Sequence, residues 1–341
     1  MTGMWTVIAA IAAFAIAALS GIWLIPFLKK IHFGQTIREE GPKWHDSKKG
    51  TPIMGGFMFI IASLAAGIVC VLLYHAFGID ETPLLTAKIF AGMFMAAAFG
   101  AIGFIDDYIK AVKKRNLGLT AWQKLILQFI VAIAYLVTVA LFGGSTETFI
   151  PFYGMFDVGI LYYPISAILI VGIVNAANLT DGIDGLDGSV TFFISIFIML
   201  IASYVSRVGV SIMSAALAGG CLGFLVWNFH PAKVFMGDTG SLYLGGYICA
   251  LAFALDMPIM LILFGLVYII EMFSVILQVL YFKATHGKRL FKMSPIHHHF
   301  EMCGWSEVRI VVMFSILAVI CGALSFIVVV FGNYRIPAFT A

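Results

Sequence analysis

The sequence is short of charge. Only 11% of its 341 residues are Asp, Glu, Lys or Arg, whereas 62% are hydrophobic; a soluble domain usually carries about 25% charged residues. One globular core cannot hide so much apolar surface, so lipid must cover the rest. This composition excludes an ordinary soluble protein and predicts an integral membrane protein.

Paired cysteines are also missing. The five cysteines are scattered through mostly apolar stretches without a CxxC pair: Cys70, Cys221, Cys249, Cys303 and Cys321. This pattern argues against a disulfide framework and against a thiolate zinc site. Small hydrophobic side chains packed between helices account for it instead. The first apolar run lacks a preceding basic segment and a cleavage site, so we expect a retained anchor rather than a signal peptide.

Long apolar stretches, by contrast, are abundant. A membrane-spanning helix needs about 20 mostly apolar residues, and ten stretches qualify: 4–28, 52–77, 84–105, 122–142, 160–179, 188–206, 210–229, 240–256, 258–282 and 308–331. The seventh and eighth stretches lie close together, and Pro258 alone separates the eighth, 240–256, from the ninth, 258–282, so nine or eleven spans remain alternatives. We predict an all-α polytopic membrane protein of about ten transmembrane helices, with a small extracytoplasmic hairpin near 143–159.

The positive charges are segregated between alternate connections. Of the 20 lysines and arginines, all but Lys88, Arg207 and Arg335 fall in the odd-numbered connections of the ten-span arrangement. Membrane proteins keep an excess of Lys and Arg in cytoplasmic loops. The split therefore predicts that the odd connections face the cytoplasm and that both termini are extracytoplasmic.

Three groups of acidic residues lie where a predicted helix meets a cytoplasmic loop: Asp106 and Asp107 in GFIDDYIK, Asp181, Asp184 and Asp187 in NAANLTDGIDGLDG, and Asp238 in VFMGDTGS. Neighbouring carboxylates repel one another and lose hydration near a bilayer, so they favour a bound cation. Oxygen ligands indicate Mg²⁺ rather than zinc. A solvated helix end is the alternative for any one group, but three groups on one face predict a catalytic or ion-binding site.

The last predicted cytoplasmic connection contains three consecutive histidines, His297, His298 and His299, in MSPIHHHFE. Zinc ligands are normally separated by several residues, so three adjacent imidazoles do not suit one metal. They can instead donate hydrogen bonds to phosphate or sugar oxygens and titrate near neutral pH. A solvated polar turn is the alternative.

The sequence allows more than one role for two lysines and one glutamate. Lys48 and Lys124 are suited to binding phosphates beside an acidic site, or serve only as positive-inside anchors. Glu271 lies within the ninth predicted span, where an acidic side chain is costly. It either pairs within the helical bundle or marks a break in its helix.

Five motifs occur in a fixed order: HDSKKGTPIMGG, GFIDDYIK, NAANLTDGIDGLDG, VFMGDTGS and SPIHHHFE. Together, between ten spans, they make the chain resemble the bacterial phospho-N-acetylmuramoyl-pentapeptide transferase family of the polyprenyl-phosphate N-acetylhexosamine-1-phosphate transferase superfamily. The resemblance covers nearly the whole chain and implies a single integral membrane catalytic domain over residues 1–341.

The resemblance also implies an activity. A member of this family transfers phospho-MurNAc-pentapeptide from UDP-MurNAc-pentapeptide to undecaprenyl phosphate, giving lipid I and UMP in a Mg²⁺-dependent reaction of peptidoglycan synthesis. We therefore expect a multi-pass homodimer in the bacterial inner (plasma) membrane, with its active site at the cytoplasmic face and no nucleic-acid partner.

Roles for individual residues follow from the same resemblance. Asp238 would be the principal Mg²⁺ ligand with Asp106 and Asp107 beside it, and one of that pair would be the base for the lipid phosphate. The uridine pocket would be bordered by Asn178, Leu179, Gly182 and Asp184, with Phe235 stacking on uracil. The diphosphate and sugar would be surrounded by Asn175, Asp181, Lys48, Lys124, His297, His298 and His299, of which Asp181 and the three histidines are also implied to be catalytic.

Two other functions remain alternatives. A sister enzyme that uses UDP-GlcNAc would keep the acidic motifs, but it usually has an arginine-containing histidine motif in place of SPIHHHFE. A cation-coupled transporter or flippase would hold its ionisable residues near the membrane midplane on broken helices, where Glu271 is nearly the only candidate.

Overall fold

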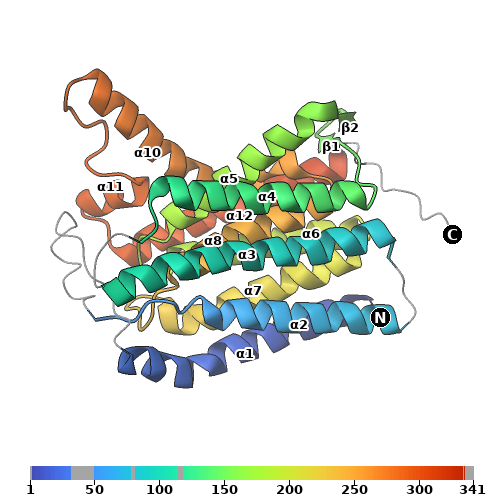
Figure 1. Ribbon diagram of the computed structural model, residues 1–341, viewed down its shortest axis with the longest axis horizontal. Coiled ribbons are helices and arrows are strands. Elements are labelled where there is room, and N and C mark those ends of the chain that lie inside the picture. Colours follow the sequence, from blue (N-terminus) through green and yellow to red (C-terminus); the bar gives the residue numbers. More distant parts are fainter. Residues whose placement is uncertain (1, 32–49, 78–80, 114–117, 333, 335–341) are drawn as a thin grey trace.

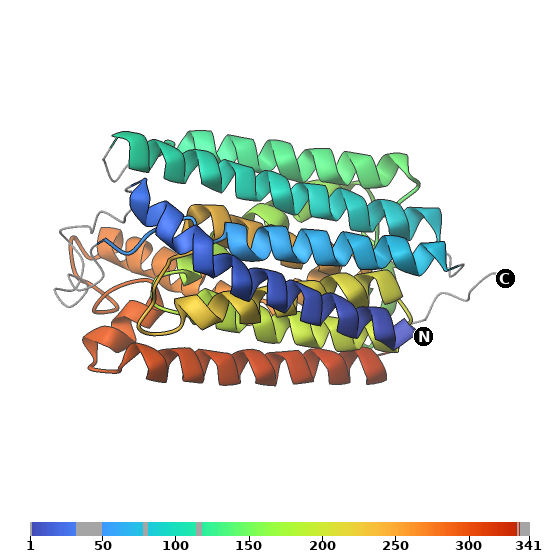
Figure 2. The ribbon, with the colours of Figure 1, turned by 90° about the horizontal axis from the view of Figure 1, so that it is seen from below.

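The computed structural model describes residues 2–31, 50–77, 81–113, 118–332 and 334. Long helices run side by side along one axis (Figures 1 and 2). They are α1 (Thr2–Lys30), α2 (Phe57–Ala76), α3 (Pro83–Lys113), α4 (Ala121–Leu141), α5 (Tyr162–Thr180), α6 (Leu186–Tyr204), α7 (Val208–Asn228), α8 (Gly237–Ala254), α10 (Leu266–Ala284) and α12 (Glu307–Phe331). The shorter elements are α9 (Leu261–Phe264), α11 (Ile296–Met302), and the 3₁₀ turns η2 (Gly159–Leu161) and η3 (Pro258–Met260).

Nine helices in the described part of the chain are long and apolar enough to cross a membrane. The remaining long helix, α8, has 18 residues, and every residue from Thr239 to Ala254 is buried. It packs between α3 and α5 and also contacts α2, α6 and α7. Because protein rather than lipid surrounds α8, it tolerates the polar residues of its first turn. The nine helices and α8 correspond to the ten predicted stretches, so the prediction of an all-α polytopic membrane protein is confirmed.

The predicted span over 258–282 is not one continuous helix. Residues 258–264 form η3 and α9, and α10 begins after Gly265. Beyond this break α10 leans out of the bundle, at the end of the molecule where α11 lies (Figure 1). Glu271 lies inside α10, past the break, so the break lies at Gly265 and the acid does not mark it.

The predicted hairpin is also present. Strands β1 (Glu147–Ile150) and β2 (Gly154–Asp157) pair antiparallel, with Glu147 opposite Asp157. The backbone N–H of Phe149 donates to the carbonyl of Asp256, just after α8, and that of Phe152 donates to the carbonyl of Gly332, just after α12. The hairpin therefore closes one end of the bundle over two helix termini.

The acidic motifs gather at the other end of the bundle. There α3 and α5 end, α8 begins, and α11 lies beside them (Figure 1). The start of α1 and the end of α12 both lie at the hairpin end (Figure 2). An even number of crossings places the two termini on the same side, which agrees with ten long helices.

Candidate active site

Asp106 and Asp107 lie near the end of α3 and are 3% and 2% exposed. Asp106 Oδ1 accepts a hydrogen bond of 2.7 Å from the backbone N–H of Leu119, and its Oδ2 lies 2.6 Å from Lys110 Nζ. Lys110 follows Asp106 by four residues on the same helix, and residues so spaced share a helix face. One helix thus supplies two acids and a counter-charge.

Asp107 anchors the beginning of α8. Its Oδ2 accepts hydrogen bonds from the Thr239 backbone N–H at 2.9 Å and from the Thr239 hydroxyl at 2.7 Å, and its Oδ1 accepts from the Asp238 backbone N–H at 3.2 Å. The residue before α8, Met236, provides no side-chain cap. The first N–H groups of a helix need acceptors from outside it, and Asp107 supplies them from α3.

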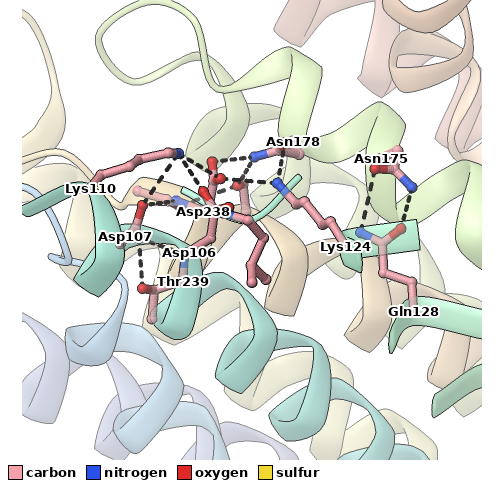
Figure 3. A network of polar contacts seen from close by, with 12 residues as sticks. Asp106, Asp107, Lys110, Lys124, Gln128, Asn175, Asn178, Asp238 and Thr239 are labelled. Atoms are coloured by element: carbon pink, nitrogen blue, oxygen red, sulfur yellow. Dashed lines mark hydrogen bonds and ion pairs between the residues drawn. The ribbon is translucent and has the colours of Figure 1, made fainter. Parts of the chain in front are cut away.

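Asp238, in the first turn of α8, is the centre of the polar network (Figure 3). Its Oδ2 accepts hydrogen bonds from Lys110 Nζ and Lys124 Nζ, both at 2.9 Å, and its Oδ1 accepts one of 2.8 Å from the Asn178 side-chain amide. Two ammonium groups at this distance stabilise the negative charge of this half-buried carboxylate. Asp238 therefore joins α3, α4, α5 and α8 at one point.

The start of α4 is fixed by a capping box. The Thr120 hydroxyl accepts a hydrogen bond from the Gln123 backbone N–H, and the Gln123 side chain accepts one from the Thr120 backbone N–H. This reciprocal pair defines where the helix begins. Lys124 follows in the first turn of α4 and reaches Asp238 and, at 3.3 Å, the carbonyl oxygen of the Asn178 side chain.

The three carboxylates have the donor set of a hard divalent cation. One oxygen each of Asp106, Asp107 and Asp238 lie within 4.8 Å of one another. Protein donors contact both oxygens of each carboxylate, and such contacts orient metal ligands. The Lys110 ammonium lies 2.6, 3.9 and 2.9 Å from the three acids, so they already surround a positive charge. These residues fit Mg²⁺, which takes carboxylate oxygens and keeps room for water and phosphate.

Asn175 lies one helical turn before Asn178 on α5 and faces a different partner. Its side-chain amide donates to Gln128 Oε1 at 2.7 Å and to the Val171 carbonyl at 2.8 Å, and Gln128 donates back at 3.4 Å. Figure 3 shows this pair beside the acid cluster and separate from it. Asn175 links α4 to α5 and thereby supports Lys124 and Asn178.

The loop between α5 and α6 carries Asp181, Gly182 and Asp184. Burial, followed by the negative charges of Asp187, Asp238, Asp107 and Asp184, raises the pKa of the Asp181 carboxyl well above its ordinary range. The Asp181 carboxyl therefore favours the neutral form more than a solvent-exposed aspartate does.

Asp184 faces a neighbouring loop. Its Oδ2 lies 3.0 Å from His230 Nδ1 and accepts a hydrogen bond of 3.0 Å from the Ala232 backbone N–H. The Asp184 backbone N–H donates to Glu307 Oε2 at 3.0 Å. These contacts join the loop before α6, the loop after α7 and the first turn of α12, and they leave Asp184 only 2% exposed.

The three histidines point in three directions, because adjacent residues on a helix are turned by about 100°. His297 Nδ1 lies 3.0 Å from Glu271 Oε2, and His298 Nδ1 lies 2.5 Å from Glu301 Oε2. His299 Nδ1 accepts a hydrogen bond from the Lys292 backbone N–H at 3.1 Å. The open role of Glu271 is thus answered: it pairs within the bundle.

Three further predicted residues have less distinctive surroundings. Leu179 is half-buried in the last turn of α5, and the Phe235 backbone N–H donates to the Pro52 carbonyl at 2.9 Å just before α8. Lys48 lies outside the described residues. Sequence reasoning had not assigned Lys110 or Thr239 to the site. The spacing of Lys110, three and four residues after the two acids, was the signal for it; nothing in the sequence indicated Thr239.

The unequal bonding of the paired acids predicts unequal effects on stability. Asp107→Asn replaces a carboxylate oxygen with an N–H₂ group facing the donors at the start of α8, so we expect a loss of about 1–3 kcal/mol and a lower melting temperature. Asp106→Asn can keep its one backbone hydrogen bond. It loses the charge pairing with Lys110, but Lys110 keeps its contact with Asp238 and repulsion among the acids falls, so the melting temperature should stay within about 2 °C of wild type. Thermal unfolding of the detergent-purified variants tests this; equal losses would contradict the capping role.

Comparison with known proteins gives two results. Residues 89–256 match the family described as Glycosyl transferase family 4. Proteins named phospho-N-acetylmuramoyl-pentapeptide-transferase are similar over most of their length. The one from Heliobacterium modesticaldum is 47% identical over 92% of this chain and 95% of its own. Those from Halalkalibacterium halodurans and Bacillus subtilis are both 48% identical, over 89% and 88% of this chain and 91% and 90% of their own.

The matched family region runs from α3 to the end of α8 and so contains the whole acid cluster. Identity of this level extends over about nine-tenths of this chain and of each relative. The chain belongs to the phospho-N-acetylmuramoyl-pentapeptide-transferase family.

Proposed function

We propose that this protein transfers phospho-MurNAc-pentapeptide from UDP-MurNAc-pentapeptide to undecaprenyl phosphate, releasing UMP and forming lipid I. In the net reaction, a lipid-phosphate oxygen becomes bonded to the phosphorus that carries the sugar. The bond from that phosphorus to the bridging oxygen breaks, and UMP leaves with that oxygen. The observation that carries the proposal is the meeting of Asp106, Asp107 and Asp238 with Lys110 and Lys124 in a chain of this family.

The arrangement suits phosphoryl transfer, which depends mainly on positioning and on neutralising charge. Asp106, Asp107 and Asp238 would hold Mg²⁺, which when bound neutralises phosphate oxygens and orients them. Lys124 is held between Asp238 and Asn178. Its side chain is therefore already ordered in a position from which the ammonium can bind an anionic diphosphate. Asp107 fixes the start of α8 and so the position of Asp238.

We further propose that the acid cluster faces the cytoplasm. In the described residues, Lys29 and Lys30 end α1 at the acidic end of the bundle, and Lys110 and Lys124 lie in the site itself. Lys88 and Arg207 lie toward the hairpin end. The positive-inside tendency then orients the site toward the soluble nucleotide, while the lipid phosphate reaches it from the bilayer surface. An inner-membrane location and a homodimer remain predictions from the resemblance.

Release of UMP from two nucleotide sugars tests the substrate. Purified protein in detergent, supplied with undecaprenyl phosphate and Mg²⁺, should release UMP from UDP-MurNAc-pentapeptide and not from UDP-GlcNAc. Release should also need the lipid phosphate, which separates transfer from hydrolysis. Turnover of UDP-GlcNAc alone would assign the sister reaction, and no release from either would overturn the proposal of a transferase.

A further inference from the structure

A buried acid–histidine pair joins α10 to α11. Glu271 of α10 and His297 of α11 are both 0% exposed, and Glu271 Oε2 lies 3.0 Å from His297 Nδ1. The other polar atoms of the two side chains, Glu271 Oε1 and His297 Nε2, are also buried and have no hydrogen-bond partner among the described residues. Burying two ionisable groups in a membrane protein costs free energy, so such a pair indicates a functional role.

The unpaired nitrogen of this histidine faces the acidic loop. A Cβ atom placed on Gly182 would lie 2.1 Å from His297 Nε2, so the imidazole edge rests directly against the backbone of this residue. Only a glycine permits that approach. Gly182 directly follows Asp181 in the loop between α5 and α6. His297 therefore has one nitrogen on Glu271 and the other against the loop that carries Asp181 and Gly182.

We propose that Glu271 is a positioning residue for His297. Its carboxylate accepts the hydrogen bond of Nδ1–H and fixes the plane of the ring, so that the Nε2 edge is held against Gly182 and supports the loop that carries Asp181 beside the proposed site. A carboxylate behind a histidine sets which nitrogen carries the proton and holds the ring in one orientation. This inference rests on the proposed transferase function, because it assigns a role within that reaction.

The neighbouring histidines argue for a special role of this pair. Glu301 comes from the same short helix as its partner His298, three residues away, and His298 is 14% exposed in its side chain. Glu271 instead comes from a membrane-spanning helix, 26 residues before His297. The contact between Glu271 and His297 therefore ties α11 to α10. Losing it would free the imidazole ring of His297, whereas losing the His298–Glu301 pair would affect only contacts within α11.

Glu271→Gln tests the proposal because it keeps the size of the side chain and removes its charge. We expect kcat for UMP release to fall about 10- to 100-fold, as for other groups that orient a functional histidine. The Michaelis constant for the nucleotide and the melting temperature should change little. Ser274→Ala is the matched control: Ser274 is buried one turn further along α10 and donates only to the Glu271 carbonyl, so its removal should leave kcat unchanged.

A double-mutant cycle separates positioning from packing. If Glu271 acts through His297, Glu271→Gln should cause no further loss of kcat in a His297→Ala background, because coupled residues are not additive. Additive losses would overturn the proposal. So would wild-type kcat in Glu271→Gln, or a loss of kcat accompanied by a melting temperature more than about 5 °C lower.

If UMP release by the His297→Ala variant is too slow to detect, the single variants Glu271→Gln and Ser274→Ala decide the question. A reduced kcat in Glu271→Gln with wild-type melting temperature, against an unchanged Ser274→Ala, supports the proposal, and any other pattern overturns it. UMP release by the wild-type protein is measured in parallel. Its absence would refute the proposed function itself, whereas its presence with a fully active Glu271→Gln would refute only the role of Glu271.

Discussion

Asp238→Asn is expected to lower the rate of UMP release about 10³-fold or more. Asparagine has the same shape and can still bond to Asn178, but it removes the charge that Lys110 and Lys124 both contact at 2.9 Å. The three-carboxylate oxygen set then loses its central anion, and groups that stabilise charge in a transition state each contribute about 10²–10³ to a rate. Loss of the cation as well would add to this.

The rate of the Asp238→Asn variant is informative only if the protein still folds. We expect its melting temperature to remain within a few degrees of wild type, about 1 kcal/mol, and binding of UMP, measured by isothermal calorimetry, to remain detectable. Asp157→Asn, the same substitution in the exposed β2 strand at the opposite end of the bundle, is the control and should release UMP at the wild-type rate. A folded Asp238→Asn variant with wild-type turnover would rule out Asp238 as the centre of the site.

Gly103→Ala is expected to have the second large effect. A Cβ atom on Gly103 would lie 2.0 Å from the Asp238 carbonyl oxygen and 2.6 Å from the Thr239 backbone nitrogen. Because both neighbours are backbone, α3 and the start of α8 must separate, which moves Asp238 away from Asp106 and Asp107. Displacing a reacting group by about 1 Å can cost about 10²-fold in rate, and overpacking costs about 1–3 kcal/mol or more in stability.

Gly100→Ala provides the matched control for this substitution. Gly100 lies one turn earlier on the same face of α3, and its added Cβ would meet the Thr239 carbonyl and Tyr243 Cβ at 3.4 Å, an ordinary contact. Alanine favours a helix over glycine by about 1 kcal/mol, so Gly100→Ala should be as stable as wild type or slightly more so, and active. Equal behaviour of the two variants in thermal unfolding and UMP release would mean that the close approach of α3 and α8 is unimportant.

Much of the fold was predictable because the membrane imposes a simple rule on sequence. Runs of about 20 apolar residues must be helices that satisfy their own backbone, and nine of the ten predicted stretches meet this rule as observed helices. The break at Gly265 was not predicted, since apolar residues continue on both sides of it. The burial of α8 was equally hidden: it begins with the polar sequence Gly-Asp-Thr-Gly-Ser, yet every residue from Thr239 to Ala254 is buried.

The candidate site was predictable in its membership and not in its geometry. Grouping acids at helix ends identified Asp106, Asp107 and Asp238, and these three do meet. The sequence could not separate Asp107, which caps α8, from Asp106, because that difference arises only when α3 packs on α8. Nor could it reveal that Glu271 meets His297, since 26 residues and a helix reversal lie between them.

Binding of Mn²⁺ as a spectroscopic substitute for Mg²⁺ tests most directly whether the three carboxylates form a divalent-cation site. Electron paramagnetic resonance should report about one tightly bound Mn²⁺ per wild-type chain, displaced by excess Mg²⁺, as expected for an all-oxygen site. The site should be lost in Asp238→Asn and retained in Asp157→Asn. Undiminished binding of Mn²⁺ by a folded Asp238→Asn variant, or no binding by the wild-type protein, would contradict the account.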